Sequence, residues 1–519
     1  MLFFVVSFLA IIAYLYMKQS SKKQQPLPPG PPGLPFIGNA LYLRKNVGRE
    51  RQMHKELRAK YGDMVYLKAG PSTNMLLVFD ERIAQDLFVK RGAIYSSRPD
   101  MKVLKHLDPH GIAILPYGKE WKTTRKLFHG VLGTHQADRF RPHQDYESVR
   151  YSANMLHEPE KFVEWSKLFT MSSITSILLG LRMPSLHTPI AEAIHLVDQI
   201  LIDAFIPGRY LVDFFPFLDA LPDIISPWRR GANAGFRQIM SLYLPLWHEA
   251  QERIKNGTMA FPTCSEYLVD VQKKDPEFWT DERIASGAIQ DLIFAASDTS
   301  SSYVRLFEVM AGTFPDKVKK AQEELDAVIG PNRLPTWEDE PNLPYVRAFI
   351  KEVHRYYTFA PFAVPHAAMK DDVYNGYFIP KGTLHYPEPE SFSPERFLDH
   401  NLGAAASAAL TDTRKRDHFA FGFGRRICPG IHVAENGTYI QVSRLLWGFN
   451  FGELFIAGTK QRARVEDVCR VQLIDGVDYE IDIKPRNPRV VECFVSLFLL
   501  HLYSHILARN PHPISSHRL

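Results

Sequence analysis

The chain has 519 residues, and its 45% of apolar side chains is enough to bury a large core. The formal net charge of +5 is small for this length, and the absence of a dense basic tail excludes nucleic acid as a partner. The four cysteines have no CxxC spacing, which argues against a zinc site or a disulfide framework and indicates a reducing compartment: they are Cys264, Cys428, Cys469 and Cys493.

Residues 1–18 predict an N-terminal membrane anchor. The stretch 2–17 carries no charge, and as a helix it would span about 25 Å, which suits the thin endoplasmic reticulum membrane. The lysines that follow predict a cytosolic position for the rest of the chain (Lys18, Lys22 and Lys23). A cleaved signal peptide is the alternative, but its basic leading segment and small-residue cleavage site are missing. We therefore expect a single-pass anchor in the endoplasmic reticulum membrane.

The rest of the chain divides into three further segments. Residues 19–35 are basic and then proline-rich, which predicts a stiff, extended hinge. Residues 36–490 read as one catalytic domain, and residues 491–519 form an apolar tail that is atypical for such a domain. Apolar periodicity predicts a mainly α domain with a small β part. The expected helices cover residues 49–61, 81–91, 118–132, 162–181, 190–205, 228–255, 281–313, 315–329, 345–356 and 430–447, and the expected strands cover 64–68 and 75–79.

Residues 206–222 are apolar, aromatic and interrupted by prolines, between two of the predicted helices. One interpretation is a buried connection. The other is a hydrophobic lip that dips into the membrane and guides a lipophilic substrate inward. The sequence leaves both interpretations open.

The loop 421–430 (FGFGRRICPG) carries the strongest chemical signal in the chain. A thiolate such as that of Cys428, bound to a haem iron, pushes electron density onto the metal and favours cleavage of the O–O bond. Such a sulfur needs a tight loop whose backbone N–H groups point at it, and glycines supply the required backbone freedom. A helix that begins at Gly430 would direct its positive end at the sulfur.

This loop resembles the haem-binding signature of the cytochrome P-450 family, Phe-x-x-Gly-x-Arg-x-Cys-x-Gly, at every fixed position: Phe421, Gly424, Arg426, Cys428 and Gly430. The resemblance implies the largely helical cytochrome P-450 fold with heme b (iron protoporphyrin IX) as its cofactor. It also implies that Cys428 is the metal ligand and that Arg426 contacts a haem propionate.

Two further motifs follow the order of this family. Glu352 and Arg355 resemble its Glu-x-x-Arg, and Arg396 lies in a Pro-Glu-Arg-Phe segment, so the resemblance implies a structural network of these three residues. Residues 294–300 (FAASDTS) resemble its oxygen-binding helix. In that helix, Asp298 and Thr299 match the catalytic acid–alcohol pair that delivers protons to iron-bound oxygen.

Other matches extend the resemblance to the cofactor edge and to the partners. Trp121, Arg125 and His366 fall where family members contact the haem propionates. Membership implies that an NADPH-cytochrome P-450 reductase supplies electrons and that one atom of O₂ enters a lipophilic small molecule. The anchor, the hinge and residues 207–217 are similar to fungal members that oxidise secondary metabolites, such as the O-methylsterigmatocystin oxidoreductase group.

The resemblance is interrupted after Thr383, where about one strand and its following turn are missing. Two alternatives stay open, and the gap motivates only the second. One is a haem-thiolate isomerase or dehydratase that does not use O₂, against which the intact Asp298–Thr299 pair argues. The other is a degenerate, non-catalytic member of the family.

Overall fold

The computed structural model describes residues 25–509, except for 71–72, 207–208, 280, 357–363, 381–391, 401, 413–414, 418–419, 423 and 469–477. The predicted anchor 1–18, residues 19–24 of the hinge and residues 384–391, which follow Thr383, lie outside the described residues. Within the described part of the chain, no helix is both long and apolar enough to cross a bilayer.

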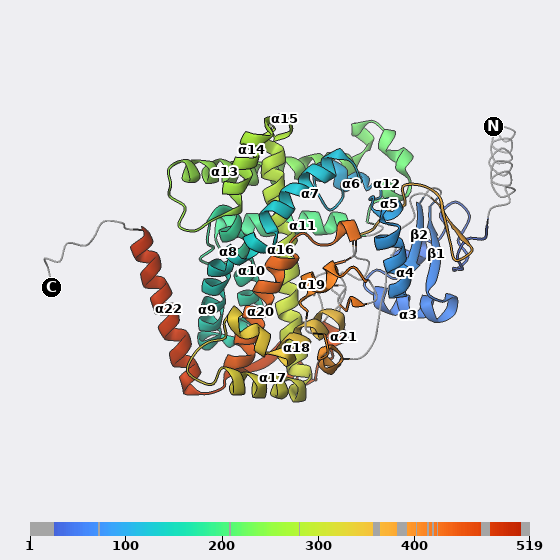
Figure 1. Ribbon diagram of the computed structural model, residues 1–519. Helices are drawn as coiled ribbons and strands as arrows, with labels where there is room; N and C mark the ends of the chain where they lie inside the picture. The colour runs from blue at the N-terminus through green and yellow to red at the C-terminus, as the bar shows by residue number, and fades with distance from the viewer. Residues whose placement is uncertain are drawn as a thin grey trace, which may run out of the picture.

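Helices dominate the described residues, and the predicted mainly α class is confirmed (Figure 1). The longer helices are α3 (Glu50–Tyr61), α7 (Lys119–Leu132), α9 (Arg141–His157), α10 (Phe162–Leu179), α11 (Pro189–Phe205), α13 (Pro227–Lys255), α14 (Cys264–Lys274), α16 (Glu282–Thr313), α17 (Pro315–Val328), α18 (Pro344–Tyr356), α20 (Ile431–Gly448) and α22 (Pro488–Arg509). The shorter helices are α2 (Ala40–Lys45), α4 (Glu81–Gln85), α5 (Gly92–Tyr95), α6 (Lys102–Leu107), α8 (Thr134–Arg139), α12 (Leu211–Phe214), α15 (Pro276–Trp279), α19 (Ala404–Ala409) and α21 (Val465–Val468).

The described strands form three separate antiparallel hairpins. They pair β1 (Met64–Ala69) with β2 (Thr73–Val78), β3 (Asp372–Tyr374) with β4 (Tyr377–Ile379), and β5 (Phe449–Ile456) with β6 (Tyr479–Pro485). The first hairpin lies on the side of the molecule opposite α22 (Figure 1). This first hairpin is therefore peripheral, whereas β5 packs directly against α16.

The 32-residue helix α16 runs through the middle of the molecule and packs against α10, α13, α20 and β5 (Figure 1). It begins at Asp281, whose carboxylate accepts a hydrogen bond from the backbone N–H of Arg283 and so caps the helix. Apolar residues cover most of its circumference, as expected for a helix that is buried on nearly all sides.

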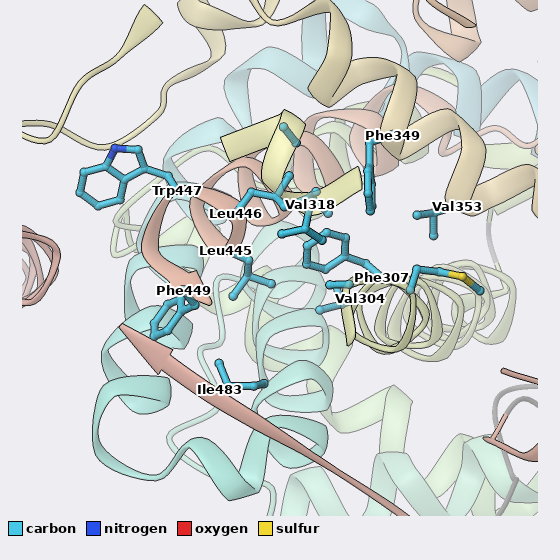
Figure 2. Close-up of a cluster of buried hydrophobic side chains, with 14 of the residues drawn as sticks. Val304, Phe307, Val318, Phe349, Val353, Leu445, Leu446, Trp447, Phe449 and Ile483 are labelled. Atoms are coloured by element: carbon cyan, nitrogen blue, oxygen red, sulfur yellow. The ribbon is translucent and has the colours of Figure 1, made fainter. Parts of the chain in front are cut away.

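A hydrophobic core joins α16 to the helices that carry the candidate site. Figure 2 shows Val304 and Phe307 of α16 facing Phe349 of α18 and Leu446 of α20, with β5 and β6 closing the cluster. Phe307 and Phe349 are fully buried, and each such side chain contributes about 1.5–3 kcal/mol through the removal of apolar surface from water. The packing therefore holds α16, α18 and α20 rigidly relative to one another.

The apolar tail begins as an ordered part of this core. Phe494 of α22 is fully buried, and its ring lies 5.7 Å from the ring of Trp447 and 5.9 Å from that of Phe449. The helix then runs along α9 at the edge of the molecule (Figure 1). Leu499 and Leu500, further along α22, expose 58% and 61% of their surface.

Candidate functional site

The turn before α20 folds tightly around Cys428. The backbone N–H of Cys428 donates a hydrogen bond to the carbonyl oxygen of Phe421 at 2.8 Å, which closes the loop. Gly422 and Gly424 both have positive φ, and a Cβ at Gly424 would overlap the carbonyl oxygen of Phe88. Both positions therefore favour glycine: another residue would be strained at Gly422, and at Gly424 it would also clash.

Cys428 is deeply placed but not fully enclosed. Burial raises the pKa of its thiol, while a hydrogen bond from the backbone N–H of Gly430 and the positive charge of Arg125 act in the opposite direction. The surface of Cys428 is nevertheless only partly covered. A sulfur atom that lines an internal space would be both removed from bulk water and only partly covered by protein atoms. Gly430 precedes Ile431, the first residue of α20, so the positive end of that helix also faces the sulfur.

Three guanidinium groups gather beside this loop, and we call Arg98, Arg125 and Arg426 the arginine group. Arg426 is buried and donates to the carbonyl oxygens of Ser96 at 2.7 Å, Ile112 at 3.3 Å and Leu115 at 2.7 Å. Burial first, and then the charges of Arg98 and Arg125, lower the pKa of Arg426 to about 8. Among the described residues, no carboxylate forms an ion pair with Arg125 or Arg426. The arginine group is therefore a buried concentration of positive charge that favours an anion.

Two other predicted residues lie at this edge. The ring of Trp121 is buried on α7, and the guanidinium carbon of Arg426 lies 4.3 Å from its centroid. The Nδ1 atom of His366 lies 2.8 Å from the carbonyl oxygen of Tyr95, so Nδ1 carries the proton in this contact. The structure thus brings Trp121 and His366 to the same region of the fold as the arginine group.

The middle of α16 presents an uncovered face, although the helix as a whole is buried. Ala295 is exposed, and Asp298 and Thr299 are partly exposed. The hydroxyl of Thr299 donates to the carbonyl oxygen of Ala295 at 2.6 Å, in competition with the backbone hydrogen bond of the helix. Because a helix buried in a solid core would have no exposed alanine at its centre, this face borders an open space.

The predicted structural network is formed. Arg355 donates to both carboxylate oxygens of Glu352 at 2.6 and 2.8 Å, and Arg396 donates to Glu352 at 3.3 Å. Glu352 is fully buried and also accepts from the backbone N–H of Ser393. This carboxylate thereby ties α18 to the 3₁₀ turn η6 (Pro394–Phe397).

Comparison with known proteins identifies the family. The family model for Cytochrome P450 matches residues 28–454, which is most of the chain.

The chain belongs to the cytochrome P450 family.

Curated fungal relatives agree with this assignment. The chain is 38% identical to the cytochrome P450 monooxygenase polD of Polytolypa hystricis (strain UAMH7299), over 86% of this chain and 87% of that protein. It is 35% identical to the cytochrome P450 monooxygenase verL of Clonostachys rogersoniana, over 82% and 80% of the two chains, and 35% identical to the cytochrome P450 monooxygenase fogE of Aspergillus ruber (strain CBS 135680), over 90% and 87%. The predicted fungal monooxygenase of the secondary-metabolism type is confirmed.

A cytochrome P450 is a haem b protein and an oxidoreductase that incorporates oxygen from O₂, and both predictions are confirmed for this chain. The residues present fit such a group. Haem b has two carboxylates, and among the described residues Arg125 and Arg426 form no ion pair with a carboxylate of the protein. Cys428 is only partly covered and Ala295 is exposed, which leaves surface at both places for contact with such a group.

The cytochrome P450 motifs did not reveal every functional candidate. The sequence left Arg98 open as a propionate contact or a surface arginine, and in the structure it donates to the carbonyl oxygens of Ala113 and Val364, both at 2.8 Å. Asp198 was missed, because a single aspartate in an amphipathic helix gives no signal. It is buried against α16 beside Asp298.

Proposed function

We propose that this cytochrome P450 inserts one oxygen atom from O₂ into a lipophilic small molecule of fungal secondary metabolism, with Cys428 as the axial sulfur ligand of haem b. The observation that carries the proposal is the pairing of two features. The closed loop holds Cys428 beside the N-terminus of α20, and the uncovered face of α16 carries Asp298 and Thr299. When bound, the haem supplies the activation of O₂.

The arginine group and its neighbours would hold the carboxylates of the haem. Arg125 and Arg426 provide charge, and the ring of Trp121 supports the guanidinium of Arg426 from one side. His366 belongs to a distant segment of the chain that lies against the arginine group. Arg98 donates to the carbonyl oxygens of Val364 and Pro365 in this same segment. Charge-assisted hydrogen bonds of this kind are shorter and stronger than neutral ones.

Asp298 and Thr299 would handle protons at the uncovered face of α16. The Thr299 hydroxyl, which donates to Ala295 in this structure, is mobile about one bond and can turn toward a polar ligand. The Asp298 carboxylate, one residue away, can take up a proton from water and pass it on to such a hydroxyl. Neither this geometry nor the comparisons favour the alternative of an isomerase or dehydratase that does not use O₂.

Exposed cations near Cys428 support docking of an acidic electron donor, the NADPH-cytochrome P450 reductase. Lys122 and Lys126 lie exposed on α7, and Arg425 is exposed in the loop itself. Arg425 donates to the hydroxyl of Tyr117 at 2.7 Å, which fixes its position. A positive patch of this kind steers an acidic partner toward the sulfur side of the cofactor.

We also propose attachment to the endoplasmic reticulum membrane through residues 1–18. Support comes from the proline-interrupted segment 206–222, which the sequence left open as a buried connection or a lip. Some of its apolar side chains are exposed, Leu211 by 64% and Phe217 by 66%, as is Ile224 just beyond the segment by 82%, whereas Val212 and Phe214 are buried. Exposed side chains of this type favour contact with lipid.

The test of this function is oxygen incorporation in fungal or yeast microsomes that contain the full chain and a reductase. We expect a lipophilic product that carries one atom of ¹⁸O from ¹⁸O₂, and only when NADPH is present. A product formed without NADPH or without label would contradict the proposal.

Replacing Thr299 with valine is expected to lower product formation per NADPH by about 100-fold, because a positioned proton donor contributes about 10²–10⁴-fold. The haem absorption spectrum should not change. Thr313→Val is the matched control, since the Thr313 hydroxyl donates to the carbonyl of Val309 at 2.7 Å on the same helix, far from the uncovered face. Equal losses in the two variants would show that the effect comes from the helix and not from proton delivery.

A further inference from the structure

Asp198 is a buried carboxyl group that contacts the proton-handling turn of α16 from outside. It lies on α11 and exposes 1% of its surface. Its Oδ2 atom accepts a hydrogen bond from the hydroxyl of Ser297 at 3.0 Å. Within the described part of the chain, Oδ1 has no hydrogen-bond partner. A charged carboxylate in such a place would be strongly destabilising, because one oxygen is neither solvated nor bonded.

Ser297 connects this carboxyl group to Asp298 and Thr299. Besides donating to Asp198, Ser297 accepts a hydrogen bond on its backbone carbonyl from the hydroxyl of Thr170 of α10, at 2.9 Å. The turn of α16 next to Asp298 is therefore hydrogen-bonded to two neighbouring helices, α10 and α11. Such side-chain bonds to neighbouring helices hold this turn of α16 in one conformation.

The titratable groups that act on Asp198 are acidic or phenolic. Helix α6 also packs against α11, but its basic residues pair with Asp100 and Asp219: they are Lys102, Lys105 and His106. Asp298 faces it from α16 and Tyr243 from α13, while α10 contributes only the hydroxyl of Thr170. No lysine or arginine among the described residues pairs with Asp198. Burial first, and then the charge of Asp298, raise the pKa of Asp198 well above its ordinary value, and the hydrogen bond from Ser297 offsets only part of this rise.

We propose that Asp198 is a positioning residue for proton delivery, and that it holds the turn containing Asp298 and Thr299 as a neutral carboxylic acid bonded to Ser297. The proton sits on Oδ1, because the hydroxyl of Ser297 donates to Oδ2 and favours the carbonyl form of that oxygen. A neutral acid leaves Asp298 as the only charged carboxylate of the pair. Ionisation of Asp198 would place a second negative charge behind Asp298 and displace the turn.

This inference rests on the proposed monooxygenase function for its consequence, but the state of Asp198 can be measured without turnover. Infrared difference spectra of the haem-loaded protein are expected to show the C=O stretching band of a protonated carboxylic acid at neutral pH that is lost in Asp198→Asn. Asp203→Asn is the matched control on the same helix, because Asp203 is exposed and forms an ion pair with Arg209 at 3.0 Å. If Asp198→Asn removes no such band, the proposal is wrong.

The pH profile of product formed per NADPH separates positioning from a merely structural role. Asparagine keeps the hydrogen bond from Ser297 and cannot ionise, so Asp198→Asn should match the wild type near neutral pH. At high pH the wild type should lose product as Asp198 ionises, whereas Asp198→Asn should keep a flat profile. Asp198→Ala, which removes the contact, should lose about tenfold at every pH. An alanine variant with full yield, or wild-type and asparagine profiles that fall together, would overturn the proposal.

The two hypotheses fail in different ways. If the wild type forms no labelled product, the proposed function fails while the infrared result on Asp198 still stands. If the wild type forms product and the variants behave alike, only the role of Asp198 fails.

Discussion

Replacing Arg426 with alanine is expected to yield a protein that no longer retains haem. In the structure this guanidinium donates to three buried carbonyl groups and lies over the ring of Trp121. Each carbonyl left without a donor costs about 1–3 kcal/mol. The carbonyls belong to Ser96, Ile112 and Leu115. The two segments that carry them would therefore no longer be joined to the haem-binding loop by hydrogen bonds of Arg426. The haem-to-protein ratio after purification measures the effect.

Arg426→Lys should retain nearly as little haem as Arg426→Ala, since a single ammonium group cannot reproduce the forked donors of arginine. Arg425→Ala is the matched control: this neighbour is exposed and binds only the hydroxyl and ring of Tyr117. It should keep a full complement of haem and show instead slower reduction by the reductase. A haem-replete Arg426→Ala protein would contradict the assignment of Arg426 to the cofactor edge.

Replacing Glu352 with alanine is expected to lower the free energy of unfolding by about 3–5 kcal/mol, because it removes the fully buried carboxylate on which this ion-pair network depends. Glu352 is fully buried and holds Arg355, Arg396 and the backbone of Ser393 at once. Its loss should also release η6 from α18. Denaturant unfolding, followed by circular dichroism, measures the change in stability.

Glu323→Ala is the control for this second prediction. Glu323 lies on α17 with 63% of its side chain exposed, and its ion pair with Lys319 is long, at 3.9 Å. Exposed pairs of this kind contribute about 0–1 kcal/mol. A loss of stability in Glu352→Ala no larger than in Glu323→Ala would show that the network is not a structural element of this chain.

Helices with a clear apolar stripe were predictable, whereas helices with buried polar faces were not. The predicted helix at residues 281–313 differs from α16 by only one residue at its start. In contrast, α9 was missed because His143, Gln144, Glu147 and Ser148 give its buried face a polar pattern. Glu147 is fully enclosed and pairs with Arg182 at 3.1 Å, a partner that only the tertiary structure supplies. Periodicity in apolarity cannot report such contacts.

The candidate site also contains residues that the local sequence predicts and residues that depend on tertiary contacts. Its motif residues follow from local chain chemistry, because the loop at Cys428 needs glycines where φ is positive and an N–H directed at the sulfur. Arg98 and Asp198 have no local signature. Their roles arise from contacts between distant parts of the chain: Arg98 donates to Val364, 266 residues further on, and Asp198 accepts from Ser297, 99 residues further on.

The carbon monoxide difference spectrum of the dithionite-reduced full chain, recorded beside that of Cys428→Ala, tests the central claim most directly. A thiolate ligand shifts the Soret band strongly to the red, and we predict this band for the wild type and its loss in the variant. Arg425→Ala serves as the control that should keep the band. A wild-type spectrum without the red-shifted band, or one that survives in Cys428→Ala, would contradict the assignment of Cys428 as the haem ligand and with it the proposed monooxygenase.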